Sequence, residues 1–427
     1  MSIFTSNIEL SSDNYPTIRP TLDLNFAATK TLDHRITFTR DSAGTYVDEL
    51  GIIRYATNNV PRFDHNPTTG ESLGLLIEES RTNQVAYSNS GSGLGDAPYY
   101  GNWNSSSYTD NFAVAPDGTT TAWKMTPTSP SASKVKRINV TAGNTYTFSV
   151  WLKKDPSVSV SDGIWDYLKY LITWSQNGST VTSATIEQLV SGSTTSAELT
   201  TEWRRFSVSY TAPANVTSME FGLSNSNSGT GDPGYSVFVW GAQLEEGAFP
   251  TSYIPTNGST VTRGADNAKI TGTNFTDFYN QNEGTFFIDS GIAQGSSYLG
   301  YLGSGTSSAS DGGPSNNFNT IMSDNDNSDV ILNIWDNSAE QATIPFAYPA
   351  SGNIKVAGVY KTNDFAISMN GSAVSSDSIG SIDTNQDQFW IGRRPYTANG
   401  YLNNSIKKIS YYNKRLPDAQ LQGLTQQ

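Results

Sequence analysis

The sequence has 427 residues, which exceeds the usual size of one domain, so we expect two or three domains. Charged residues are 15% of the chain and the net charge is −13. Nucleic-acid binding needs clustered Lys and Arg, and the longest basic cluster is only Lys134, Lys136 and Arg137, so we expect no nucleic-acid partner. Cysteine is absent, which excludes disulfides, thiolate nucleophiles and Cys-ligated metals.

Neither membrane insertion nor secretion through a signal peptide is expected. No run of about 18 apolar residues is present, and the first residues lack a basic stretch followed by an apolar one. Abundant Ser, Thr, Asn, Gly and aromatic residues favour many short strands joined by small-residue turns. We therefore expect an all-β protein made of tandem antiparallel β-sandwiches.

Residues 1–85 form the first predicted segment, which we expect to be irregular and to attach to a partner or pack on the first sandwich. Ile36–Thr39 and Thr45–Val47 predict two short strands around a turn at Gly44. Leu73–Ile77 is an apolar run that must be covered by another part of the protein.

Residues 86–255 form the first predicted sandwich, because apolar and polar residues alternate along successive runs without helical periodicity. Turn signals such as Pro116–Gly118 and Asp232–Gly234 separate these runs. The residues predicted to share one face of a strand are Tyr146, Phe148, Val150 and Leu152; Phe206, Val208 and Tyr210; Met219, Phe221 and Leu223; and Tyr235, Val237 and Val239.

Residues 256–269 are predicted to be a linker, and 270–427 a second sandwich. Asn370–Gly371 is a strong hairpin signal, because both residues tolerate the positive φ of a type I′ turn. Pro417 suits a first helical turn, so one short helix is expected over Leu416–Leu421. The strands of this sandwich are predicted at Thr285–Ile288, Val330–Trp335, Ile354–Tyr360, Phe365–Met369, Phe389–Ile391 and Ile406–Tyr411.

Three sets of segments give the sequence a family resemblance. They are Arg40–Val47, Pro61–His65 and Gly74–Asn83; Trp240–Glu245, Pro250–Thr256 and Val261–Arg263; and Asp364–Gly371, Trp390–Gly392 and Ile406–Leu421. The first two sets resemble segments of phage tail-fibre, tail-spike and related virion proteins. The region between them is similar to carbohydrate-binding-module jelly rolls, and the third set resembles a concanavalin A-like (laminin G-like) domain.

The resemblance implies a virion structural protein in which a jelly roll is followed by a concanavalin A-like sandwich. Such a protein is assembled in the host cytoplasm and released by lysis, and its partners are other virion proteins and host-surface polysaccharide. The resemblance also favours a homo-oligomer, a trimer above all, although no heptad run predicts a coiled coil.

Aromatic residues beside amides and carboxylates are the candidate glycan-binding residues, because rings stack on sugars while amides and carboxylates bind hydroxyl groups. Core packing is the alternative role for each ring. The candidates are Trp165, Tyr167 and Trp174 in the first sandwich, and Trp335, Asp336 and Asn337 in the second.

A calcium site is a weaker hypothesis at residues 324–329. Asp324, Asp326 and Ser328 alternate oxygen ligands, as a hard cation requires. However, Asp329 stands where a calcium loop needs Gly, and Trp335 where it needs Glu, so a solvated loop is favoured. No other cofactor is expected.

No catalytic residues are predicted. The two histidines, His34 and His65, both lie in the first segment, where structural roles are favoured. Glu78–Glu79 and Glu245–Glu246 are adjacent pairs whose side chains point to opposite faces of a strand.

The leading functional hypothesis is a tail-fibre or tail-spike component that adheres to host glycans. The second is an architectural role in a head decoration, head fibre or tail tip without glycan binding. The third is an exopolysaccharide depolymerase with two convergent carboxylates.

Overall fold

The computed structural model describes residues 14–94, 106–127, 133–157, 169–176, 179–180, 185–188, 199–224, 236–294, 297–303, 318–323, 329–349, 352–395 and 400–426. The chain divides into two compact units. The C-terminal unit takes its residues from 1–50, 56–80 and 264–427, and the middle unit from 51–55 and 81–263. The middle unit is therefore inserted between two stretches of chain that fold together.

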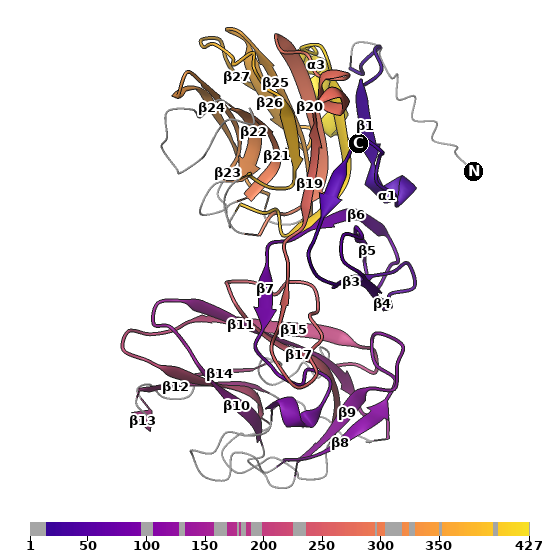
Figure 1. The fold of residues 1–427 in the computed structure, drawn as a ribbon, viewed down its shortest axis with the longest axis vertical. Helices are drawn as coiled ribbons and strands as arrows, with labels where there is room; N and C mark the ends of the chain where they lie inside the picture. Colours follow the sequence, from indigo (N-terminus) through magenta and orange to yellow (C-terminus); the bar gives the residue numbers. More distant parts are fainter. Residues whose placement is uncertain are drawn as a thin grey trace, which may run out of the picture. The chain divides into compact units, whose positions relative to one another are not determined.

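The C-terminal unit is a sandwich of two antiparallel sheets (Figure 1). The eight-stranded sheet has the order β27 (Ser375–Asp377), β26 (Phe365–Met369), β25 (Asn353–Lys361), β20 (Glu283–Gly291), β29 (Asn404–Tyr412), β6 (Ser72–Ile77) and β5 (Phe63–His65), with β1 (Leu22–Asn25) also paired to β29. The seven-stranded sheet has the order β2 (Thr37–Thr39), β19 (Asn267–Thr271), β28 (Gln388–Ile391), β21 (Ser297–Gly303), β22 (Phe318–Ser323), β23 (Asp329–Asp336) and β24 (Ala339–Ala347). The remaining elements of this unit are α1 (Phe26–Thr29), β3 (Gly44–Val47), α2 (Thr273–Thr276) and α3 (Asp418–Thr425).

The core of the C-terminal unit lies between its two sheets. Alternate residues of each strand enter it, as Phe286 and Ile288 do from β20, and Phe389 and Ile391 from β28. A second apolar cluster covers the outer face of the eight-stranded sheet, where Leu421 of α3 packs on residues of β25, β26 and β29. Burial of apolar side chains, here between the sheets and beneath α3, supplies most of the stability of a sandwich.

Two local predictions for this unit are confirmed. Asn370 and Gly371 have φ values of 47° and 76°, and the N–H of Ser372 donates to the carbonyl of Met369 at 2.9 Å, which forms the expected turn. The terminal helix is present, but it starts at Asp418, so Pro417 occupies the N-cap position, one residue before the predicted helical position.

The predicted N-terminal segment and linker are not separate parts of the structure. β1 and β6 pair with β29 in the eight-stranded sheet, and β2 pairs with β19 in the seven-stranded sheet. Residues 1–85 were predicted to be irregular, but most of their described residues build the C-terminal sandwich. The proposed linker, 256–269, instead contains β18 (Val261–Arg263) and the start of β19. The sequence did not predict this arrangement because these strands are short and pair with partners that are distant along the chain.

The middle unit has two five-stranded antiparallel sheets around its own core. One sheet contains β10 (Ser133–Asn139), β16 (Ser218–Ser224), β12 (Lys169–Gln176), β13 (Ser179–Thr180) and β14 (Thr185–Gln188). The other has the order β15 (Arg204–Thr211), β11 (Thr145–Lys154), β17 (Val237–Glu246), β9 (Ala122–Pro127) and β8 (Ser106–Ala113). The unit also contains a 3₁₀ helix (Gly91–Leu94), the pair β7 (Arg81–Asn83) and β18, and most of β4 (Ile53–Ala56).

The alternation predicted for the middle unit is confirmed. Tyr146, Phe148, Val150 and Leu152 of β11 all enter the core, and so do Met219, Phe221 and Leu223 of β16, and Val237 and Val239 of β17. Val208 enters it from β15, with Phe206 and Tyr210 partly buried beside it. Tyr235 lies outside the described residues. The chain is thus an all-β protein of antiparallel sandwiches, as its sequence predicts.

Candidate binding surface

Four aromatic residues gather on the outer face of the seven-stranded sheet. Tyr298, Tyr301 and Trp390 form one cluster, with Trp335 packed against it. We call these four residues the aromatic platform. Their strand neighbours Leu299, Leu302, Ile334 and Phe389 belong to the core, so the platform faces away from it.

Strand pairing positions the platform. Tyr301 of β21 lies opposite Trp390 of β28, and a bulge between Tyr298 and Gly300 places Tyr298 on the same face as Tyr301. The Trp390 Nε1 donates to Gln388 Oε1 at 3.0 Å, which fixes the indole. Tyr298, Tyr301 and Trp390 are 8%, 3% and 9% exposed, while Trp335 is the more accessible ring.

Hydroxyl and amide groups continue the platform across the sheet. Thr320 lies opposite Tyr301 and next to Asn333, which in turn lies opposite Thr343. Asn333 Nδ2 donates to Thr343 Oγ1 at 2.6 Å, and Thr320 Oγ1 donates to the carbonyl of Gly300 at 3.0 Å. This combination of rings with hydroxyl and amide groups is the chemistry that sugar binding uses.

Three cations lie against the platform and its neighbour Tyr401. Lys269 Nζ is 4.8 Å from the centroid of the Trp390 ring, and Lys269 pairs with Trp390 across β19 and β28. The Arg393 guanidinium carbon is 5.0 Å from the Trp390 centroid and 4.5 Å from that of Tyr401. The Arg394 guanidinium carbon is 5.7 Å from the Tyr298 centroid. These distances are within the range of cation–π attraction.

The three candidate residues at 335–337 do not act together. Trp335 joins the aromatic platform. Asp336 is 8% exposed and accepts a hydrogen bond from the Ser381 hydroxyl, so it has a structural contact. Asn337, with φ of 52°, forms the turn between β23 and β24 together with Ser338, whose φ is 61°. Trp335 and Asp336 do not share a surface because side chains of adjacent strand residues point to opposite faces of the sheet.

The other sequence-predicted residues are not tested by the structure. Trp165 and Tyr167 lie outside the described residues, and so do the calcium candidates Asp324, Asp326 and Ser328. Trp174 belongs to β12, but its side chain is outside the description. In the residues that the structure describes, no group of three or more His, Asp or Glu side chains is placed to hold a metal ion.

Sequence reasoning missed Tyr298, Tyr301 and Trp390 as members of a surface cluster. A signal for Trp390 was present, because it lies between Phe389 and Ile391, and alternation sends it to the opposite face. The signal for Tyr298 and Tyr301 was hidden, because a bulge breaks the alternation along β21.

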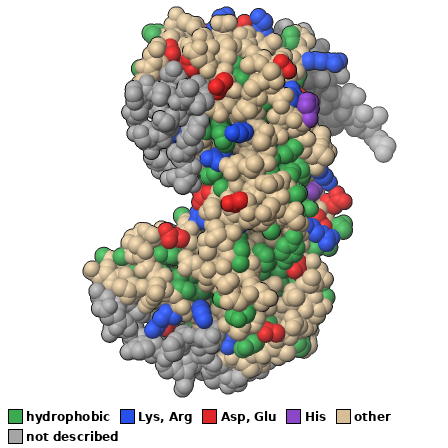
Figure 2. Space-filling model, viewed as in Figure 1, with side chains coloured by type: hydrophobic (Ala, Val, Ile, Leu, Met, Phe, Trp, Pro, Cys, Tyr) green, Lys and Arg blue, Asp and Glu red, His purple; other side chains and the backbone are tan. Residues whose placement is uncertain are grey.

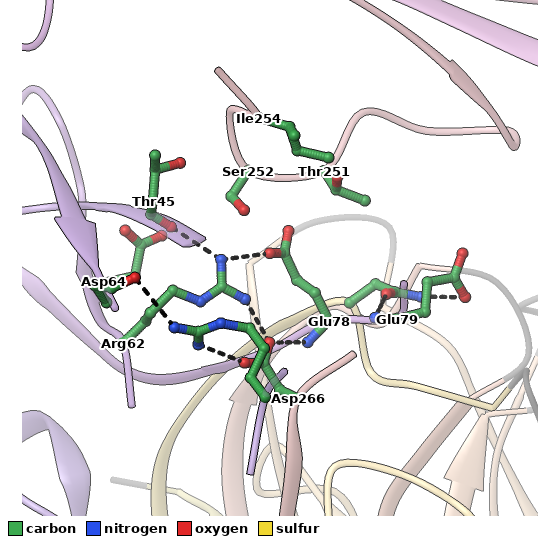
Figure 3. Close-up of polar contacts among 12 residues, drawn as sticks. Thr45, Arg62, Asp64, Glu78, Glu79, Thr251, Ser252, Ile254 and Asp266 are labelled. Atoms are coloured by element: carbon green, nitrogen blue, oxygen red, sulfur yellow. Dashed lines mark hydrogen bonds and ion pairs between the residues drawn. The ribbon is translucent and has the colours of Figure 1, made fainter. Parts of the chain in front are cut away.

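A buried ionic centre joins three separate segments of the chain inside the C-terminal unit (Figure 3). Arg40 Nη1 lies 2.9 Å from Asp266 Oδ1, Arg62 Nη2 contacts Asp266 Oδ2, and Arg62 Nη1 lies 2.8 Å from Glu78 Oε2. Backbone carbonyls of Ser42, Thr57 and Val60 accept hydrogen bonds from Arg40, and that of Thr45 accepts one from Arg62. Burial alone lowers the pKa of Arg62, but Asp266 and Glu78 outweigh it, so the pKa is raised.

This centre is structural. The side chains of Arg40, Arg62 and Asp266 are 0% exposed, so no ligand reaches them. Beside them, burial raises the pKa of Asp64 to about 6, although the hydrogen bond from the Val47 N–H opposes the shift. His65 is buried and contacts the Val47 carbonyl through Nδ1 at 2.9 Å, while the His34 side chain is 86% exposed.

The motif of β17 and residues 250–256 is also structural. Gln243 and Glu245 are fully buried, with Gln243 Nε2 donating to Glu245 Oε2 at 2.8 Å. The N–H of Thr251 donates to Glu245 at 3.0 Å, and the N–H of Ile254 donates to Gln243 Oε1 at 2.7 Å. The two side chains therefore hold the segment after β17 against that strand, and Tyr253 packs on Trp240 with ring centroids 4.4 Å apart.

Charged side chains are scattered among uncharged ones on the face shown in Figure 2. None of the described helices has the length and apolar character required to span a membrane.

Comparisons with known proteins give no family for this chain. No family model and no curated protein matches it. Among solved structures, a Trypanosoma rangeli sialidase bound to the inhibitor DANA matches with 15% identity and a TM-score of 0.28, over 37% of this chain and 26% of the sialidase. The match therefore spans about a quarter of the sialidase.

Two carbohydrate-binding modules are also similar. The tandem CBM22 domain of Paenibacillus barcinonensis Xyn10C matches over 79% of this chain and 98% of its own length, with 9% identity and a TM-score of 0.26. A CBM4 structure matches over 36% of this chain and 93% of its own length, with 16% identity and a TM-score of 0.20. At these TM-scores the matches assign no function, and the fold class rests on the sheets described above.

Proposed function

We propose that this chain is a non-enzymatic structural protein of a phage particle, of the tail-fibre or tail-spike kind, and that its C-terminal unit adheres to host-surface glycans. The observation that carries the glycan-binding part is the aromatic platform, with its neighbouring threonines and Asn333, on the outer face of a sheet. The virion part rests on the resemblance of the segments around Arg40, Glu78 and Trp240 to phage proteins.

The non-enzymatic part is supported by the buried carboxylates that the structure describes. Asp266 and Glu78 are bound by arginines, and Glu245 by Gln243 and the backbone of Thr251. A glycosidase needs two accessible carboxylates across a cleft. These three residues serve the fold instead.

Substitution of Trp335 tests glycan binding. We expect Trp335→Ala in the full chain to weaken polysaccharide binding by about tenfold, because one stacked ring contributes about 1 kcal/mol or more. Trp335→Phe should retain most of the binding. The measurement is biolayer interferometry against a panel of neutral and acidic polysaccharides, with the melting temperature recorded for each variant.

Trp203→Ala is the matched control. Trp203 is a partly buried ring of the middle unit whose Nε1 donates to the carbonyl of Val114 at 2.9 Å. Its loss should leave binding unchanged. Equal binding by wild type and Trp335→Ala, with both proteins folded, contradicts the proposed role of the platform.

A purely architectural role is the second candidate, favoured by exposed apolar residues of the middle unit. Tyr108 and Phe112 of β8 are 40% and 48% exposed, and Val114 is 60% exposed. Exposed apolar side chains on an edge strand and directly after it favour contacts with other proteins. Locating the chain by cryo-EM of the particle separates the two: density at a fibre tip supports adhesion, and density within a lattice of other proteins supports architecture.

A further inference from the structure

The positive charge on the platform points to a more specific ligand. The chain has a net charge of −13, yet Lys269, Arg393 and Arg394 meet on one small area of its surface. A local potential opposite in sign to that of the whole chain selects for anionic groups at that place.

The backbone fixes this arrangement of charge. Lys269 is held in register with Trp390, and Arg393 follows Gly392, whose φ of 67° turns the chain out of β28. The N–H of Arg394 donates to the carbonyl of Gly400 at 3.2 Å, and Arg393 pairs with Tyr401 in an isolated bridge. The cations are therefore carried by paired backbone.

The cations occupy two of the four platform rings. Lys269 and Arg393 both lie against Trp390, and Arg394 lies against Tyr298, so these two rings support cations. Arg393 is 7% exposed, whereas Lys269, Arg394 and Trp335 are only partly buried. The surface offered to a ligand thus combines two cationic groups with the accessible ring of Trp335.

We infer that the platform recognises a carboxylate-bearing polysaccharide, with Lys269 and Arg394 binding the carboxylates and Trp335 stacking on a sugar ring. This inference rests on the proposed glycan-binding function and names its ligand class. Arg393 is a positioning residue, since it is buried and its guanidinium lies against the rings of Trp390 and Tyr401. Burial lowers its pKa, and an anion bound nearby would offset that desolvation.

The test compares polygalacturonate, dextran and dextran sulfate as ligands for the full chain. We expect binding to polygalacturonate, weaker binding to dextran, and an affinity for polygalacturonate that falls as sodium chloride rises from about 0.05 M to about 0.5 M. Lys269→Gln and Arg394→Gln should each weaken polygalacturonate binding roughly fivefold or more. Lys269→Arg should retain it.

Lys355→Gln is the control, because it removes the same charge from β25 of the opposite sheet and should leave binding unchanged. Equal losses in Lys269→Gln and Lys355→Gln would show a general charge effect and overturn the inference. Dextran binding that equals polygalacturonate binding and depends on Trp335 would also overturn it, while the proposed function stands. Tighter binding to dextran sulfate would overturn the assignment of carboxylate as the ligand group. Failure of the whole polysaccharide panel to bind would overturn the proposed function itself.

Discussion

At the residue scale, Asp266 is the carboxylate that both arginines of the ionic centre contact. It accepts hydrogen bonds from Arg40, Arg62 and the N–H of Glu78. Removing one partner of such a buried group is strongly destabilising, about 3–5 kcal/mol, because the remaining charges lose their compensation. Residues that look like functional motifs in the sequence, such as Arg40 and Glu78, are thus explained by the fold.

Asp64 provides a pH test of this region. Its pKa in the folded protein is raised to about 6 from an ordinary value of 3.8, so the folded state holds the proton more tightly than the unfolded state. The stabilisation is present below about pH 4 and is lost as the pH rises through about 6. We expect the wild type to lose up to about 3 kcal/mol over this interval relative to Asp64→Asn.

Urea titrations followed by hydrogen exchange of peptides from β5 and β6 measure this difference. Asp33, whose pKa is lowered to about 2 mainly by its hydrogen bond with Arg35, titrates in both proteins and cancels in the comparison. A stability difference between wild type and Asp64→Asn that is constant from pH 4 to pH 7 would contradict the assignment.

At the element scale, β6 depends on one glycine. Gly74 has φ of +91°, and a Cβ at this position would collide with the carbonyl oxygen of Ile406 in β29. We expect Gly74→Ala to destabilise the C-terminal unit by more than about 2 kcal/mol, since both the conformation and the strand pairing are affected. Thermal unfolding monitored by circular dichroism provides the measurement.

Gly352→Ala supplies the comparison for Gly74→Ala. Gly352 has a similar φ of +97°, but a Cβ there would meet no atom within 4 Å. It isolates the conformational cost, which is about 1 kcal/mol. Similar stability losses in the two variants would show that close packing of β6 on β29 is unimportant.

Strands were predictable from the sequence where alternation is regular, as in β11 and β16, because each residue reports its own face. The bulge in β21 concealed that Tyr298 and Tyr301 lie on the same face of the sheet. The sequence predicted Trp335 as a binding residue because it is an aromatic residue beside a carboxylate and an amide. Asp336 and Asn337 were grouped with it only because they are adjacent in the sequence. Side chains of adjacent residues in a strand point to opposite faces of the sheet, so adjacent residues need not share a surface.

At the scale of the whole molecule, the division of the chain into units could not be predicted locally. Strand partners such as Leu22 and Tyr411 lie at opposite ends of the sequence, and no periodic pattern reports such a pairing. Asp266 N–H donates to the carbonyl of Glu78 at 2.9 Å, so the two points where the chain leaves and re-enters the C-terminal unit lie side by side. The middle unit is therefore an insertion with adjacent ends.

Excision tests this organisation. We expect a chain in which residues 81–263 are replaced by a short Gly-Ser linker to fold into the C-terminal sandwich, because the linker spans ends that are already adjacent. Cooperative thermal unfolding and retained hydrogen-exchange protection of β20 and β29 would show this. The same deletion with Asp266→Asn is the comparison and should be less stable. Loss of all protection in the deletion alone would contradict independent folding.

The central position of β29 has a consequence for how the protein is made. Thr21 and Tyr411, which are hydrogen-bonded, are 390 positions apart, so a ribosome adding 5–20 residues per second needs about 20–80 seconds to deliver the partner of the first strands. During this time the middle unit is synthesised completely, while the backbone groups of β1 and β6 that pair with β29 have no partner. Premature termination before residue 404 would release chains with a folded middle unit and an incomplete C-terminal sandwich whose unpaired strands are prone to aggregation.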